Sequence, residues 1–488
     1  MRLRCVKIFC FVPASVALTG PSGRFILAAM MGLIIDCLYA AGLLVSSPIW
    51  LYRMVRHGRY REDVSQRLGE APVRHGLQPV IWIHAVSLGE VNGVRALVDE
   101  LASQLPDYQI VISSTTDTGM TQARKLFSPK RKTFRFPFDF SWAVRRAFGR
   151  LRPDLVVLME GEIWPNFLAR ANRLDVPVVL VNGRMSRDKG YPGYKRVRWF
   201  TKRLFNRLRV LAVQDQTYAE CFIELGTDSE KVRVTGTMKY DTAVVADSVA
   251  GAGELAAAIG LKRDAGEKLI VAGGTGPGEE KLLLEIFETG RANGEFDDRT
   301  RLAIVPRKPE RFDEVAALIG RTGLEFIRRS QTPDGQAPTA GAPVILGDTM
   351  GELRKFYSLA DAVFVGRSLV PMGGSDMIEA AALGKAVAFG EHGFNFPPAE
   401  ALLAAGVARQ VEDVDQLRQT LAEWLTDPAA ACEMGRKAQQ FVRSHQGATR
   451  RNVEMICDVL GRVPAERPGN IATRKIKKIP DAGSVQMR

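Results

Sequence analysis

The chain has 488 residues, of which 46% are hydrophobic and 25% charged, and this composition excludes an intrinsically disordered protein. The length allows two or three domains that each bury a core. The net charge of +13 predicts an anionic partner. Because no nucleic-acid-binding motif is present and the charge is spread along the chain, we expect a membrane surface or a phosphorylated substrate and no nucleic acid. Six cysteines without a Cys-x-x-Cys pair and five scattered histidines indicate reduced thiols and no His/Cys metal site.

An almost unbroken apolar run covers residues 32–51, about the length that crosses a bilayer, and Asp36 is its one charged residue. We predict a membrane anchor over residues 32–52, preceded by a poorly defined extension over residues 1–31. Four arginines between residues 53 and 61 place the rest of the chain in the cytoplasm. This predicts a single-pass protein of the cytoplasmic (inner) membrane. A cleaved signal peptide is the alternative, but the run is long for one and the basic residues after it oppose export.

Short runs rich in Val, Ile and Leu alternate with helical stretches in both halves of the chain. We predict strands over residues 80–85, 109–113, 155–159, 178–181 and 210–213, and again over 268–272, 302–305, 344–346, 362–365 and 386–389. Buried strands that alternate with helices indicate parallel sheets covered on both faces. We therefore expect an α/β protein with two doubly wound, Rossmann-like domains that face a cleft.

These domains are predicted over residues 75–241 and 267–462, with a linker rich in Ala, Gly and Asp over residues 242–266. The remaining residues, 463–488, are polar and basic and are predicted to be a disordered tail.

Glu90 follows the first predicted strand and a glycine, at a strand–loop–helix junction. A carboxylate at this position can reach a cleft and act as a general base. The alternative is a glutamate in the first turn of a helix, where the helix dipole stabilises it. The residues around Glu90 leave both interpretations open.

Further charged residues follow later strands of the first half. Glu160 and Glu162 form a pair of carboxylates after the strand at 155–159, next to a Trp-Pro dipeptide. Arg184 follows the next strand and can meet an anion there, although a residue of this kind taken alone is more often a surface arginine. Lys239 stands at the junction of the halves, where it can neutralise a leaving phosphate or a substrate carboxylate; a solvated lysine is the alternative.

In the second half, a glycine-rich loop covers residues 273–280. It lacks the Lys-Ser/Thr ending of a P-loop and the spacing of a dinucleotide site, so neither interpretation applies. Arg307 follows the strand at 302–305 and offers a guanidinium fork for a phosphate. Residues 347–352 form another loop, which can border a nucleotide base.

Residues 366–384 contain the strongest single signal. A predicted strand leads into Gly373 and Gly374, which permit a tight turn, and Ser375 or Asp376 can cap a helix that runs to residue 383. Backbone N–H groups and a helix N-terminus at one place predict a phosphate seat. Glu379 faces the same place and can accept hydrogen bonds from sugar hydroxyls. A tight turn with a surface glutamate is the alternative.

Seven of these segments together resemble the Kdo (3-deoxy-D-manno-octulosonic acid) transferase family of membrane-associated glycosyltransferases in lipopolysaccharide assembly. They cover residues 86–92, 160–166, 234–239, 306–312, 347–352, 371–379 and 392–396. The resemblance runs from the anchor to about residue 460. It implies the GT-B fold, CMP-Kdo as donor, a lipid A precursor (lipid IVA) as acceptor, inversion of the donor anomer, and no metal or other cofactor.

The resemblance also assigns site residues by position. Glu90 matches the family's general base, and Glu162 and Lys239 match residues that stabilise the transition state. The CMP-binding segments correspond to Pro306, Arg307, Met350, Gly351, Glu352, Asp376, Met377, Ile378 and Glu379.

The chain departs from the family pattern before Glu379. The family usually has Gly-Gly-His-Asn-Pro there, whereas this chain has Gly-Gly-Ser-Asp-Met, and Lys308 replaces the usual histidine after Pro-Arg. These departures leave a different 2-keto sugar donor open. Two alternative functions are a GT-B transferase or epimerase with a different nucleotide sugar, and a non-catalytic membrane-tethered binding protein. Such a binding protein would tolerate the loss of Glu90, Glu162 and Lys239, and all three are present.

Overall fold

The computed structural model describes residues 21–57, 62–128, 130–161, 163–188, 190–332, 334, 341–393, 396 and 398–462. Three of the predictions lie wholly or partly outside these residues: the role of Glu162, the tail at 463–488, and the first twenty residues of the N-terminal extension. All statements below concern the described part of the chain.

The first half forms a parallel sheet of seven strands in the order β3-β2-β1-β4-β5-β6-β7. The strands are β1 (Val80–His84), β2 (Gln109–Ser114), β3 (Thr133–Arg135), β4 (Leu155–Met159), β5 (Val178–Gly183), β6 (Val210–Val213) and β7 (Val232–Val234). Successive residues of β1 pack on opposite faces, Trp82 in one apolar cluster and Ile83 in the other. This alternation explains why the strands are continuously apolar.

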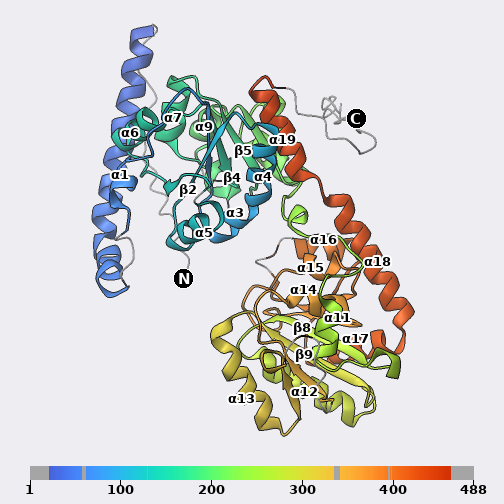
Figure 1. Cartoon of the computed structure of the whole chain (residues 1–488). Helices are drawn as coiled ribbons and strands as arrows, with labels where there is room; N and C mark the ends of the chain where they lie inside the picture. Colours follow the sequence, from blue (N-terminus) through green and yellow to red (C-terminus); the bar gives the residue numbers. More distant parts are fainter. Residues whose placement is uncertain are drawn as a thin grey trace, which may run out of the picture.

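The second half repeats the arrangement in the order β10-β11-β9-β8-β12-β13-β14, again with parallel pairing. Its strands are β8 (Lys268–Thr275), β9 (Thr300–Pro306), β10 (Phe326–Arg328), β11 (Val344–Leu346), β12 (Ala362–Val365), β13 (Val387–Gly390) and β14 (Arg409–Val411). The predicted α/β architecture of two doubly wound domains is confirmed, and Figure 1 shows the two domains on either side of a narrow connection.

Helices cover both faces of each sheet (Figure 1). In the first half they are α1 (Pro21–His57), α2 (Val64–Arg67), α3 (Leu88–Gly93), α4 (Arg95–Gln104), α5 (Asp117–Phe127), α6 (Ser141–Leu151), α7 (Pro165–Arg173), α8 (Tyr191–Lys195), α9 (Arg198–Phe205) and α10 (Gln216–Glu224). In the second half they are α11 (Ala252–Ala258), α12 (Glu279–Ala292), α13 (Phe312–Thr322), α14 (Leu353–Leu359), α15 (Ile378–Ala381), α16 (Pro398–Ala404), α17 (Val414–Thr426), α18 (Pro428–His445) and α19 (Ala448–Val459).

Each sheet has one switch point, where the strand order reverses direction. In the first sheet it lies between β1 and β4, and in the second between β8 and β12. Ligands of open α/β sheets bind at the carboxyl ends of the strands beside such a point. Glu90 follows β1 and Glu160 follows β4, while the glycine-rich loop and residues 366–379 follow β8 and β12. The predicted site residues therefore follow the strand ends at which a fold of this kind binds its ligands.

The chain crosses between the domains twice, and hydrogen bonds join the two crossings. The Asp241 carboxylate accepts from the N–H groups of Gly447 (2.6 Å) and Thr449 (2.5 Å), at the start of α19. The Gln446 amide donates to the Tyr240 and Ala243 carbonyls at 2.9 and 2.7 Å. Helix α19 then returns to the first domain, where it packs against α4 (Figure 1).

Helix α1 is the one helix among the described residues that is long and apolar enough to cross a membrane, over Gly32–Arg56. Asp36, the charge inside its apolar run, accepts hydrogen bonds from the Ser141 N–H and from the Asn166 amide, both at 2.9 Å. Tyr39 donates its hydroxyl proton to Asp139 at 3.2 Å. Asp36 and Tyr39 thus attach α1 to the N-termini of α6 and α7.

The stability of the first domain is expected to depend on pH through Asp139. Burial raises the pKa of Asp139 from 3.8 to about 7, although the N–H groups of Asn166 and Phe167 and the Tyr39 hydroxyl oppose the shift. Since the folded pKa lies above the unfolded one, folding favours the protonated form, and stability falls as pH rises from about 4 to about 7. The expected loss is about 2–4 kcal/mol. Urea unfolding across this pH range should show a flatter profile for Asp139→Asn; identical slopes in both proteins would contradict the assignment.

Candidate functional site

Glu90 lies in a reciprocal capping box at the start of α3. The Ser87 hydroxyl donates to one Glu90 carboxylate oxygen at 2.9 Å and accepts from the Glu90 N–H at 3.3 Å. The Val86 N–H donates to the other oxygen at 2.9 Å. This arrangement fixes the helix start and holds the half-buried carboxylate at the carboxyl edge of β1. The structural interpretation of Glu90 is therefore correct, and it is compatible with a role as a base.

Glu160 directly follows β4 and Asn182 is the last residue but one of the neighbouring β5, and both have left-handed backbones, with φ of 58° and 53°. The Asn182 amide lies 3.5 Å from the Glu160 carboxylate, and the Arg184 guanidinium lies 3.6 Å from it. Residues other than glycine hold such backbone angles where surrounding contacts impose them, often at functional sites. The predicted anion-facing group Arg184 is thus paired with Glu160, while Glu162 lies outside the described residues.

Lys239 extends from the first domain towards the second. Burial lowers the pKa of its ammonium, and the nearby carboxylates of Glu160 and Asp376 oppose this shift. The ammonium also lies 5.4 Å from the centre of the Phe396 ring, in a cation–π contact with the second domain. Lys239 is therefore a partly desolvated cation that carboxylates of both domains face, rather than a solvated surface lysine.

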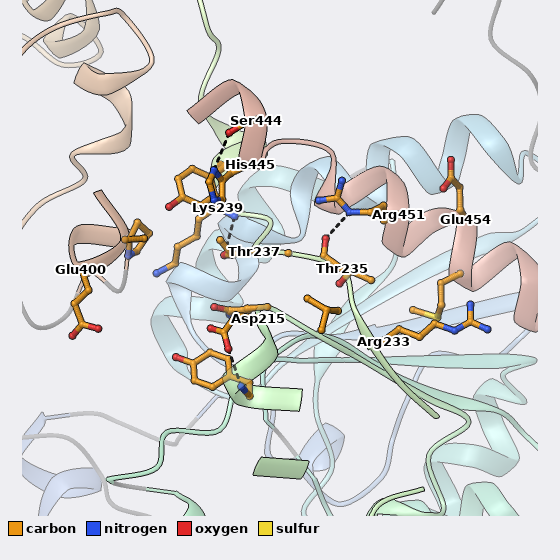
Figure 2. A pocket seen from close by; sticks show the side chains of 18 of the residues that line it. Asp215, Arg233, Thr235, Thr237, Lys239, Glu400, Ser444, His445, Arg451 and Glu454 are labelled. Atoms are coloured by element: carbon orange, nitrogen blue, oxygen red, sulfur yellow. Dashed lines mark hydrogen bonds between the residues drawn. The ribbon is translucent and has the colours of Figure 1, made fainter. Parts of the chain in front are cut away.

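A cavity of about 760 Å³ lies between the domains beside Lys239. Figure 2 shows its walls: Asp215, Thr235, Thr237 and Lys239 come from the loops after β6 and β7, and Glu400, Ser444, His445 and Arg451 come from α16, α18 and α19. The predicted interdomain cleft is thus present. Among the predicted site residues that the structure describes, Lys239 alone lines this cavity, so the groups assigned to CMP lie elsewhere on the second domain.

Arg307, Asp376 and Glu379 form a charged cluster on the second domain. Burial raises the pKa of Asp376, and Lys239 and Arg307 are close enough to oppose the shift. Burial and Asp376 raise the pKa of Glu379, which Arg307 and Arg354 oppose. Residues predicted from three separate segments of the sequence therefore lie within electrostatic range of one another. Two carboxylates that burial pushes towards neutrality, next to cations, are typical of a binding site.

The loop before Glu379 differs from its prediction in detail. Helix α15 ends at Ala381, so the expected helix to residue 383 is shorter. Asp376 caps it by accepting from the Ile378 N–H at 2.9 Å, whereas Ser375 donates to the Gly274 carbonyl at 2.8 Å. Met377 and Ile378 are buried in the core of the second domain. Their backbones, and not their side chains, are thus available at the helix start.

Pro306 ends β9 and places Arg307 directly at the carboxyl edge of the sheet, where the Arg307 N–H donates to the Thr275 carbonyl at 3.1 Å. The third predicted CMP segment, Met350 to Glu352, is more exposed than Pro306 and begins in a turn. Met350 is 69% exposed, and Gly351 has φ of 86°.

The Glu352 carboxylate is engaged by its neighbours within the second domain. It accepts from Thr349 at 2.5 Å and pairs with Arg329 at 3.0 Å and Lys355 at 3.1 Å. Burial raises the pKa of Glu352, but these three partners together lower it below its usual value. No contact among the described residues joins Glu352 to Arg307 or Glu379, so the structure does not bring it into the charged cluster.

Glu279 is a buried residue whose structural role the sequence interpretation missed. Its carboxylate is fully buried and accepts from the N–H groups of Gly276 (3.0 Å), Ser368 (2.7 Å), Leu369 (3.0 Å) and Arg367. Burial raises the pKa of Glu279, which these four donors oppose. The N–H groups directly after β12 therefore already bind an internal anion, whereas the phosphate seat was predicted further along the chain, at the glycine turn before α15. The signal for this was a glutamate immediately after a glycine-rich loop.

The sequence matches known proteins across most of its length. The family model described as 3-deoxy-D-manno-octulosonic-acid transferase (kdotransferase) matches residues 62–242. A 3-deoxy-D-manno-octulosonic acid transferase of Bordetella pertussis is 32% identical over 434 residues, which cover 85% of this chain and 96% of the relative. One from Haemophilus influenzae is 29% identical over 435 residues, which cover 87% and 98%.

The fold also has solved counterparts. A UDP-N-acetylglucosamine 2-epimerase structure matches with a TM-score of 0.51 at 15% identity, covering 82% of this chain and all of that one. This likeness concerns the fold alone, which is GT-B. The sequence identity to the curated relatives, which extends over most of the chain, shows the family. The charged residues at the carboxyl edges of both sheets are consistent with it. The chain therefore belongs to the Kdo transferase family, whose members are glycosyltransferases of lipopolysaccharide biosynthesis.

Proposed function

We propose that this protein transfers Kdo from CMP-Kdo to lipid IVA, with inversion at the anomeric carbon and without a metal ion. The observation that supports this most is the cluster of Lys239, Arg307, Asp376 and Glu379 at the interdomain edge. The donor carries two negative charges in this region, the CMP phosphate and the sugar carboxylate. Arg307 and Lys239 supply two cations, and Glu379 supplies an acceptor for sugar hydroxyls.

The proposed reaction follows from these positions. Glu90 takes the proton of the attacking acceptor hydroxyl, and the acceptor oxygen forms a bond to the anomeric carbon of Kdo. The bond from that carbon to the phosphate oxygen breaks, and CMP leaves with the electron pair. Lys239 and Arg307 neutralise the charge that develops on the leaving phosphate, in a partly desolvated site where such contacts are strong.

Two of the three departures from the family pattern before Glu379 concern the interior of the second domain. Of the residues Ser375, Asp376 and Met377, two serve the interior: Ser375 bonds the Gly274 carbonyl, and Met377 is buried. Asp376 is the one that faces the charged cluster. Ser375 and Met377 thus change how the loop packs, while Asp376 puts a carboxylate in place of the family's asparagine next to Lys239 and Arg307.

The direct test is a transfer assay with CMP-Kdo generated in situ, lipid IVA and detergent-solubilised protein, with and without EDTA. We expect transfer at the same rate in both conditions. Folded protein that binds CMP but transfers no Kdo would favour a different nucleotide sugar. A rate that EDTA abolishes and Mg²⁺ restores would contradict the metal-free mechanism.

We further propose that the first domain lies against the inner membrane on its α1 side, facing the cytoplasm. Helix α1 contacts α6 and α7, and its Leu44, Val45 and Val55 are 74, 83 and 75% exposed. Helices α6, α7 and α9 contain no acidic residue. Five neighbouring arginines lie on these helices or directly after α9: Arg145, Arg170, Arg173, Arg203 and Arg207.

These arginines repel one another, as the shifts of two of them show. Burial lowers the pKa of Arg170, and Arg145 and Arg173 add to the effect; burial, Arg173 and Arg203 do the same for Arg207. Among the described residues, none of the five forms a salt bridge. An uncompensated basic group beside an exposed apolar helix fits an anionic lipid surface.

Exchanging two of these arginines should weaken binding to anionic vesicles. Arg173→Gln combined with Arg203→Gln removes about 1 kcal/mol per charge, which predicts a roughly 30-fold loss of affinity at low salt. The measurement is co-sedimentation with phosphatidylglycerol vesicles. Arg436→Gln with Lys437→Gln on α18 is the matched control, because it removes the same charge far from α1. Equal losses in both double variants would show a non-specific charge effect.

A further inference from the structure

Asn182 occupies the centre of the hydrogen bonds at the carboxyl edge of the first sheet. It is 2% exposed and is the last residue but one of β5, with φ of 53°. Its neighbour across the ladder is Glu160, because Met159 pairs with Val181 in the register of β4 and β5. Asparagine adopts left-handed backbone angles more readily than most residues, because its short polar side chain can bond locally.

The Asn182 side chain uses both of its functional groups. Its carbonyl oxygen accepts from the Met238 N–H at 3.1 Å, and its amide donates to the Glu160 carboxylate at 3.5 Å. Its main-chain carbonyl accepts from the Gln214 amide at 3.0 Å, after β6. One buried residue thus connects the ends of β4, β5 and β6 to the loop after β7. Only an amide offers a donor on one side and an acceptor on the other in this shape.

Both hydrogen-bond partners of the Asn182 side chain affect the position or the surroundings of Lys239. Met238 is 1% exposed and directly precedes Lys239, so the bond to its N–H fixes the backbone from which the lysine extends. Glu160 is one of the two carboxylates close enough to act on the Lys239 ammonium. The position of the cation and the position of one of its counter-charges therefore depend on a single amide.

We propose that Asn182 is a positioning residue that sets the place of the Lys239 ammonium relative to Glu160 during sugar transfer. The inference rests on the proposed function, because Asn182 matters for transfer only if Lys239 stabilises the leaving phosphate as proposed. Asn182 does not reach the donor site on the second domain, and its bonds do not involve Arg307, Asp376 or Glu379. Its exchange is therefore expected to slow the transfer step without weakening donor binding.

The test compares Asn182→Gly with the wild-type protein, at temperatures well below the unfolding midpoint of each. Glycine keeps the backbone angle and removes both side-chain bonds. We expect kcat to fall about 10²-fold, the effect of an ångström-scale misplacement of a group that stabilises the transition state. The KM for CMP-Kdo and the affinity for CMP, measured by calorimetry, should stay close to wild type. A purely structural role would lower the unfolding temperature and leave kcat per folded molecule unchanged.

Two further variants complete the design. Asn182→Asp keeps the acceptor for the Met238 N–H but places a second buried carboxylate against Glu160, so kcat should again fall about 10²-fold. It carries the test if the glycine variant does not fold. Asp175→Gly is the matched control, since Asp175 also has a left-handed backbone (φ 52°) but lies in an exposed turn after α7. Its kcat should not change.

Wild-type kcat in both folded Asn182 variants, or a loss of CMP affinity in step with kcat, would overturn the inference. Failure of the proposed function is a different result, visible in the wild-type protein as an absence of Kdo transfer.

Discussion

Glu90→Gln is expected to lower kcat by about 10²–10⁴-fold, the usual contribution of a general base, with little change in stability. Glutamine serves the third position of a capping box as glutamate does, so its side-chain oxygen can still accept from the Val86 N–H. The variant therefore removes the base and keeps the start of α3. The measurement is the rate of Kdo transfer to lipid IVA, together with thermal unfolding.

The matched control for Glu90 is Ser87→Ala. This change removes the hydroxyl that bonds the Glu90 carboxylate and the cap of α3, but it leaves the carboxylate in place. We expect a stability loss of about 1 kcal/mol and a rate within a small factor of wild type. If Glu90→Gln transferred Kdo at the wild-type rate, Glu90 would be a capping residue alone.

Glu279→Gln is expected to destabilise the second domain by about 2–4 kcal/mol, because hydrogen bonds to a buried charged group are among the strongest in a fold. The carboxylate accepts from the N–H groups of Gly276, Arg367, Ser368 and Leu369. An amide turns its NH₂ group towards one pair of these donors and leaves them unpaired. Since residues 367–369 lead into the loop that carries Asp376, affinity for CMP should fall as well.

Urea unfolding and CMP calorimetry measure both effects of Glu279→Gln. Glu285→Gln on the same helix is the control, because Glu285 is exposed and forms only a surface pair with Lys281 at 3.5 Å. Surface pairs contribute little, so its stability should change by less than about 0.5 kcal/mol. A Glu279 variant as stable as the Glu285 variant would mean that the four N–H groups find other partners.

The sequence predicted the interior of both sheets and missed their edges. All ten predicted strands are present, whereas β3, β7, β10 and β14 were not predicted. These four are the outermost strands, and each has three residues. A central strand is buried on both faces and must be continuously apolar, so its composition reveals it. An edge strand is short and partly exposed, as Arg233 and Val234 of β7 illustrate, so its sequence resembles a loop.

The candidate site was predictable to the extent that its residues directly follow central strands. Glu90, Arg307 and Glu379 were identified from such positions, and Lys239 from its place at the junction of the two halves. The roles of Asn182 and Glu279 depend on hydrogen bonds to backbone groups of residues 56 and about 90 positions away, Met238 and Ser368 among them. No local pattern encodes those partners, because the fold alone brings them together.

The two hydrogen-bonded crossings between the domains also define how this molecule can close. A rotation about an axis through Asp241 and Gln446 moves each group in proportion to its distance from that axis. Lys239 lies two residues from Asp241 and hardly moves relative to the second domain. Glu90 follows β1, four strands further across the sheet from β7, or about 19 Å at the usual spacing. A closure about this axis would therefore leave the Lys239 contact nearly constant and mainly change the gap between Glu90 and the donor site.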